Sequence, residues 1–184
     1  MADRTLKPKV YLAGPDVFYP DARQRGAELC RLCAANGFVG LYPLDAPLQS
    51  GVQPLSLAIY LANRALIDQA DAVVANLRDW RGHEPDSGTV WEAAYALACG
   101  KPVVGYLPSG HSLRERMASV APTGQDAEGN EVEDFGLPLN LMLAHSLTAI
   151  VHGPEDGHAG FQAALECLKH LDGHEKNRPP SKSR

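Results

Sequence analysis

Short apolar runs alternate with segments of helical periodicity along most of this chain, and this alternation constrains its fold more than any other feature. The runs predict strands at 9–14, 38–42, 71–77, 102–107 and 148–152. The helical patterns predict helices at 20–36, 54–69, 88–99 and 161–171. Strands that are apolar on both sides are typical of parallel sheets covered on both faces. We therefore expect an α/β fold, a doubly wound, five-stranded parallel sheet (flavodoxin-like or Rossmann-like) with helices on both faces.

The length and composition indicate one globular domain. The chain has 184 residues, of which 45% are apolar, enough to form a hydrophobic core. We expect a single domain over 1–174, with a long polar loop at 108–137, and a polar tail at 175–184. Loops of that length are usually lids, interface arms or disordered segments.

Charge and hydropathy exclude several classes of partner. The net charge of −5 argues against non-specific binding to nucleic acid or to an anionic membrane, because both need a basic face. No apolar run is long enough to cross a bilayer, and the first ten residues lack the apolar stretch of a secretory signal. These observations favour a cytoplasmic protein with small-molecule partners.

The cysteines do not indicate a redox or metal site. Cys30 and Cys33 form a C-x-x-C pair, but both lie well inside a predicted helix rather than at its first turn, where a low thiol pKa is expected. Cys99 and Cys167 are distant in sequence, and the histidines lack metal-ligand spacing. We expect Cys30 and Cys33 to be buried core residues, and we predict no metal site.

The first predicted strand ends in Gly14-Pro15, at the edge of the sheet where such folds bind ligands. A single glycine there does not make the G-x-G-x-x-G motif that holds a pyrophosphate, which disfavours dinucleotide binding. Phe18 and Tyr19 follow this strand and are candidates for stacking on a planar base. The alternative is that both are ordinary core aromatics.

The segment 86–100 contains the most informative charge. Glu92 is the only charged residue between Gly88 and Gly100, in a predicted helix that is apolar nearly all round and therefore expected to be buried. A lone carboxylate in such a helix is paired with another group, exposed to solvent, or part of a functional site. The alternative is structural, because Thr89 and Glu92 have the spacing of a capping box.

Other polar residues are expected near Glu92. The third predicted strand ends at Asn76 and leads through a polar loop to Asp86, at the start of the Glu92 helix; Asp71 opens that strand. Neighbouring carboxylates shift one another's pKa, so that one ionises while another holds a proton, which is what cleavage of a glycosidic bond requires. Asp86 has an alternative role as a helix N-terminal anion, and Asp71 as a turn residue.

Five segments resemble the nucleoside 2-deoxyribosyltransferases over roughly residues 9–146. They are Tyr-Leu-Ala-Gly-Pro at 11–15, Asp-Ala-Val-Val-Ala-Asn-Leu at 71–77, Asp-Ser-Gly-Thr-Val-Trp-Glu-Ala at 86–93, Gly-Lys-Pro-Val-Val at 100–104 and Leu-Pro-Leu-Asn-Leu-Met-Leu at 137–143. The spacing from Asp86 to Glu92 is the most specific of these features. The family has the doubly wound fold that the strand pattern predicts independently.

The resemblance implies a role for each matching residue. Glu92 is the implied nucleophile, Tyr11 orients it, Asp86 binds the sugar hydroxyl, and Asp71 is a carboxylate associated with the proton of the base. Asn140 is implied to enter the sugar site of a neighbouring subunit, although an asparagine there also suits a helix N-cap. The expected site residues are catalytic Glu92, Asp71, Tyr11 and Asp86 and substrate-binding Gly14, Phe18, Asn76, Asp86 and Asn140.

The implied reaction transfers 2-deoxyribose between nucleobases with retention, through a glycosyl-glutamate intermediate. Its partners are nucleosides and free nucleobases, it needs no cofactor, and its sites are shared within a homodimer or larger homo-oligomer. Two alternatives remain. One is an N-glycosidase that hydrolyses (deoxy)nucleoside 5′-monophosphates, which needs phosphate-binding donors near the sugar. The other is a non-catalytic nucleotide-binding module, in which Glu92 only caps its helix.

Overall fold

A computed structural model describes residues 6–154 and 158–175 of the chain. Its centre is a five-stranded parallel sheet in the order β2-β1-β3-β4-β5. The strands are β1 Lys9–Ala13, β2 Val39–Leu41, β3 Ala72–Asn76, β4 Val103–Leu107 and β5 Ala149–His152. The order reverses between β1 and β3, and the predicted doubly wound fold is confirmed.

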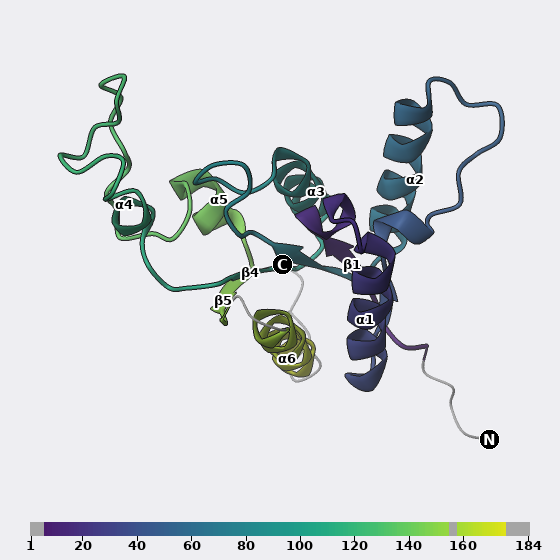
Figure 1. Ribbon diagram of the computed structural model, residues 1–184. Coiled ribbons are helices and arrows are strands. Elements are labelled where there is room, and N and C mark those ends of the chain that lie inside the picture. Colours follow the sequence, from purple (N-terminus) through teal and green to yellow (C-terminus); the bar gives the residue numbers. More distant parts are fainter. Residues whose placement is uncertain (1–5, 155–157, 176–184) are drawn as a thin grey trace, which may run out of the picture.

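Helices cover both faces of the sheet (Figure 1). Two of them, α1 (Ala22–Ala35) and α6 (Ala159–Glu175), pack on one face, where Val10 and Leu12 of β1 point. The other face carries α2 (Leu55–Gln69), α3 (Ser87–Ala98) and the short α5 (Leu141–Ser146), and Tyr11 and Ala13 point to it. Because side chains alternate along a strand, Tyr11 faces α3 while its neighbours form the opposite core.

Some predicted boundaries and burials differ from the structure. The first helix begins at Ala22 rather than at Pro20, since Asp21 is the N-cap. The structure adds the short helices η1 (Pro15–Phe18), η2 (Pro43–Asp45) and α4 (Leu113–Arg116), which are too short for a periodic pattern to show. The expected burial of α3 on all faces is wrong, because Trp91 is 42% exposed. Of the predicted tail 175–184, only Glu175, the end of α6, is among the described residues.

The cysteines of α1 belong to the core, as predicted. Cys33 is fully buried, and Cys30 packs against the same cluster. Burial raises the pKa of the Cys33 thiol to about 12, so it stays protonated at neutral pH. No helix among the described residues is both long enough and apolar enough to cross a bilayer.

The long segment 108–137 forms an arm that projects beyond the sheet and carries α4 (Figure 1). Of the three possibilities for this segment, the lid and the interface arm suit an arm with its own helix, and both stay predictions. Arg116 ties the arm to the 78–86 loop, donating to the His83 carbonyl (3.2 Å) and pairing with Asp79. Its other donor reaches the Pro138 carbonyl at 2.7 Å.

Gly26 of α1 marks a place where two elements approach closely. A Cβ at this position would lie 2.3 Å from the Tyr42 ring. The Tyr42 hydroxyl donates to the Ala22 carbonyl at 3.0 Å, which fixes the ring against α1. The ring therefore has little freedom to move aside.

We predict that Gly26→Ala lowers the free energy of unfolding by about 1–3 kcal/mol, the usual cost of overpacking, despite alanine's better helix propensity. Urea denaturation monitored by circular dichroism measures this change. Ala27→Leu, which adds bulk at an exposed position of the same helix, is the control and should change stability little. Equal stability of Gly26→Ala and wild type would contradict the close packing of Tyr42.

Candidate active site

The Glu92 carboxylate accepts a hydrogen bond from the Tyr11 hydroxyl at 2.6 Å. Tyr11 lies in the middle of β1 and is fully buried, and Glu92 lies in the second turn of α3 and is partly buried. The contact joins β1, an inner strand of the sheet, to the helix α3 that packs on the same face. It gives the only charge within α3 a fixed position.

Burial raises the pKa of Glu92 to about 7. The Tyr11 hydrogen bond opposes this rise, because it favours the ionised carboxylate, and the nearby charge of Asp86 adds to it. Burial and the same carboxylate raise the pKa of Tyr11, which therefore remains a proton donor. The pair thus holds a carboxylate that exchanges its proton near neutral pH.

Asp86, not Glu92, caps α3. The Asp86 Oδ2 atom accepts from the Thr89 backbone N–H at 2.9 Å and from the Thr89 hydroxyl at 3.1 Å. The capping box considered for Thr89 and Glu92 is therefore absent, and Glu92 is free to point away from its own helix start.

Glu92 lines a hollow of about 340 Å³, which we call the Glu92 hollow. Gly14, Phe18 and Asp86 of the expected site line it too. Phe18 is 53% exposed, so the alternative that it is a core aromatic is wrong. Its ring stacks on Trp80 with centroids 5.8 Å apart, and this leaves an aromatic surface at the side of the hollow.

Several residues that line the hollow were not predicted from the sequence, and Asn63 is the most polar of them. Asn63 lies in α2 and borders both the Glu92 hollow and an adjoining one of about 330 Å³, formed with Tyr60 and Trp91. A signal existed, because Asn63 follows Ile59 by four residues and therefore lies beside it on the helix. Leu44 and Ile59 also line the Glu92 hollow.

Asp71 lies elsewhere, and this corrects an expectation. It precedes β3 at the amino end of the sheet, is exposed, and accepts from the Lys9 backbone N–H at 2.7 Å. It does not line either hollow beside Glu92. Its structural alternative, a residue of the turn before the strand, describes this position.

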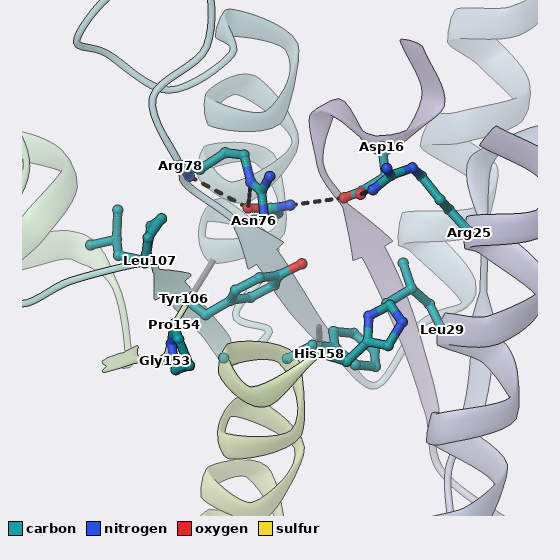
Figure 2. Close-up of a pocket in the computed structure, with 13 residues that line it drawn as sticks. Asp16, Arg25, Leu29, Asn76, Arg78, Tyr106, Leu107, Gly153, Pro154 and His158 are labelled. Carbon is teal, nitrogen blue, oxygen red and sulfur yellow. Dashed lines mark hydrogen bonds and ion pairs between the residues drawn. The ribbon is translucent and has the colours of Figure 1, made fainter. Parts of the chain in front are cut away.

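Asn76 also differs from its expected role as a substrate-binding residue. It ends β3 on the α1/α6 face, is 2% exposed, and donates from Nδ2 to the Asp16 carboxylate at 2.8 Å (Figure 2). A Cβ on Gly14 would lie 2.8 Å from the Asn76 Cβ, so Asn76 packs directly behind the loop that forms the Glu92 hollow. It supports that loop rather than lining the hollow.

Asn140 is the N-cap of α5, as its alternative interpretation predicts. Its Oδ1 accepts from the Met142 N–H at 3.0 Å, and its Nδ2 donates to Glu133 at 2.6 Å. It does not line the Glu92 hollow of its own chain. Its entry into a neighbouring subunit's site stays a prediction. Within residues 6–154 and 158–175, no three His, Cys, Asp or Glu side chains gather as metal ligands do.

Comparisons with known proteins show the family and the fold of the chain. A family model described as nucleoside 2-deoxyribosyltransferase matches residues 10–142. A solved 2-desoxiribosyltransferase from Leishmania mexicana is 30% identical, with a TM-score of 0.67, over 86% of this chain and 97% of that one. A 2-deoxyribosyltransferase from Bacillus psychrosaccharolyticus shares the fold at 21% identity and a TM-score of 0.52, over 78% of this chain and 85% of its own.

A curated relative is an uncharacterized protein of Schizosaccharomyces pombe. It is 35% identical over an alignment of 119 positions that covers 61% of this chain and 56% of that protein. The match therefore spans about half the length of the yeast protein.

We predict that Glu92→Gln raises the free energy of unfolding above that of the wild type at pH 8 but not at pH 4.5. Between the ordinary pKa of 4.5 and the folded pKa of about 7, the folded state holds a proton that the unfolded chain has released, so wild-type stability falls as pH rises. The shift corresponds to at most about 3 kcal/mol. Urea titrations at several pH values measure the difference.

Tyr11→Phe sharpens this test. Loss of the hydroxyl removes the interaction that lowers the pKa of Glu92, so the pH-dependent loss of stability should extend to higher pH. A difference between Glu92→Gln and wild type that does not vary with pH would contradict a buried, titrating Glu92.

Proposed function

The chain belongs to the nucleoside 2-deoxyribosyltransferase family, and on that premise we propose that it moves 2-deoxyribose from one nucleobase to another. The observation that carries the proposal is the Glu92 carboxylate, held at 2.6 Å by the Tyr11 hydroxyl beside a hollow with an aromatic side. A desolvated carboxylate costs stability, so its retention in a ligand-sized hollow favours a catalytic role.

In the proposed mechanism, the ionised Glu92 carboxylate attacks C1′ of the deoxyribose. The bond from C1′ to the base nitrogen breaks, a bond from C1′ to a Glu92 oxygen forms, and the departing base takes up a proton from water. A second base then attacks C1′ from the side opposite Glu92, which breaks the bond from C1′ to the Glu92 oxygen, and this base releases its proton to water. Two inversions give net retention, and Tyr11 keeps the carboxylate oriented and anionic between turnovers.

The other lining residues fit substrate binding. Among the described residues, nothing hydrogen-bonds the second Asp86 oxygen, Oδ1, so it is available to accept a sugar hydroxyl. The exposed Phe18 ring offers a surface for stacking the base. Gly14 lines the hollow with its backbone, because it has no side chain to fill the space.

The electrostatics of the hollow favour nucleosides over 5′-monophosphates. The described residues that line the Glu92 hollow include the carboxylates of Asp86 and Glu92 but no lysine, arginine or serine. A phosphate placed there would face two acids in a partly desolvated site, which is unfavourable; the Arg81 guanidinium lies over the Phe18 ring, 5.4 Å from its centroid, but does not line the hollow. This supports transfer between nucleosides over hydrolysis of nucleotides.

We also propose that a second copy of the chain completes the site. The hollow beside Glu92 continues to Tyr60 and Trp91, which are 41% and 42% exposed. Tyr60 and Trp91 contact each other with ring centroids 5.4 Å apart, and Leu57 of α2 and Met142 of α5, on helices of the same layer, are exposed as well. Exposed apolar side chains beside an open site suit a homo-oligomer that excludes water from the intermediate.

We predict that incubation with adenine and deoxyinosine or thymidine yields deoxyadenosine. Glu92→Gln should lower this rate on the order of a thousandfold or more, because the nucleophile is lost. Chromatography of the products measures both. Glu84→Gln, which removes a carboxylate of the neighbouring loop that does not line the Glu92 hollow, is the matched control and should keep its activity.

Three outcomes distinguish the alternatives in that assay. Free base without any acceptor, or faster release from a 5′-monophosphate than from a nucleoside, would indicate a hydrolase. Binding of nucleosides without turnover, unchanged by Glu92→Gln, would indicate a binding module.

We predict that Leu57→Arg dissociates the oligomer, so that the molecular mass in solution falls and the transferase activity falls with it. Leu57 is 42% exposed, so the change places a charge on the exposed side of α2 without disturbing the core. Light scattering coupled to size exclusion measures the mass. Leu6→Arg, at a position that is 95% exposed, is the control. A monomeric wild type with full activity would contradict the shared site.

A further inference from the structure

A second cavity, of about 250 Å³, lies at the carboxyl edge of the sheet but on its α1/α6 face (Figure 2). We call it the Arg78 cavity. Arg78, Tyr106 and His158 border it, and its wall toward the Glu92 hollow consists of Asp16 and Asn76. The mechanism proposed above uses none of these side chains.

The charges of this cavity have the opposite sign to those of the Glu92 hollow. Arg25 and Arg78 line it with one carboxylate, Asp16, which is already bonded to Asn76 and lies 3.6 Å from Arg25. Among the described residues that line the cavity, two cations and one anion give a formal charge of +1 with neutral histidine, whereas the whole chain carries −5. A positive cavity in an acidic protein attracts anionic ligands.

Arg78 is the cation that remains available. Its Nε donates to Asn76 Oδ1 at 3.3 Å, and no carboxylate of the described residues pairs with it. Arg25 differs, since Asp21 binds it at 2.8 Å. The planar guanidinium of an arginine matches two oxygens of a phosphate at once. Arg78 therefore has donors left for a ligand.

Two further groups border the space next to Arg78. The Tyr106 ring lies between Arg78 and His158 in Figure 2, and its hydroxyl makes no hydrogen bond to any residue of the described ranges. His158 adds a ring that donates a hydrogen bond, and a charge when protonated. The volume is smaller than the roughly 300–1,000 Å³ of pockets for drug-sized molecules, which suits a compact ligand.

We propose that the Arg78 cavity binds a small phosphate monoester, with the phosphate on the Arg78 guanidinium and next to Tyr106 and His158. The site is separate from the Glu92 hollow, because the Asp16–Asn76 pair stands between them. The proposal does not depend on the transferase activity, since it concerns binding alone.

Titration calorimetry with ribose 5-phosphate as the probe tests this proposal, with ribose and inorganic phosphate as separate arms. We predict saturable binding of ribose 5-phosphate, none of ribose, and about tenfold or greater weakening in Arg78→Gln, the usual effect of losing a charged hydrogen bond. Arg78→Lys should retain part of the affinity. Arg31→Gln, an exposed arginine of α1 paired with Glu28, is the matched control and should bind as wild type.

The remaining outcomes separate this site from the Glu92 hollow. Glu92→Gln should leave the affinity for ribose 5-phosphate unchanged; loss of binding in that variant but not in Arg78→Gln would overturn the proposal. Equal binding of inorganic phosphate to wild type and Arg78→Gln would overturn it as well. Thermal unfolding of each variant verifies that Arg78→Gln remains folded.

Discussion

The hydrogen bond between the Tyr11 hydroxyl and Glu92 connects the two parts of the molecule that matter most for its chemistry. Tyr11 belongs to β1, an inner strand paired with β2 on one side and β3 on the other, and Glu92 belongs to a helix that packs on the same face of the sheet. A rigid donor thus holds a carboxylate whose pKa burial raises to about 7. The fold therefore fixes the position of the Glu92 carboxylate and raises its pKa before any ligand binds.

The Glu92 hollow and the Arg78 cavity both lie at the carboxyl edge of the sheet, on opposite faces. The strand ends of β1 and β3 separate a hollow lined by two acids from a cavity lined by two arginines and one acid. Gly14 and Asn76 approach each other closely between the hollow and the cavity. Because side chains alternate along a strand, polar groups lie on both faces of the sheet at this edge. A doubly wound sheet with its chain reversal between β1 and β3 makes this division possible.

Much of this architecture was predictable from local patterns. The buried strands and long helices followed from hydrophobic periodicity, and Glu92 was conspicuous as one charge within an apolar helix. Asp71 was predicted to lie near Glu92 because its segment resembles the family. It precedes β3, however, and a residue before a parallel strand lies at the amino edge of the sheet, opposite the carboxyl edge where the Glu92 hollow lies. The spacing of Asn63 from Ile59 places the two side by side on α2, but which face of α2 borders the hollow depends on tertiary packing. The support role of Asn76 depends on its contact with Asp16, which no local pattern encodes.

The Asp86 side chain both caps α3 and lines the Glu92 hollow, and this limits which substitutions are tolerated at position 86. One oxygen begins α3 by capping Thr89, and the same carboxylate borders the Glu92 hollow. A replacement of Asp86 that altered the hollow would also loosen the start of α3, the helix that carries Glu92. The shape of the hollow is therefore easier to change through Phe18, Leu44 or Ile59, which line it without capping α3, than through Asp86.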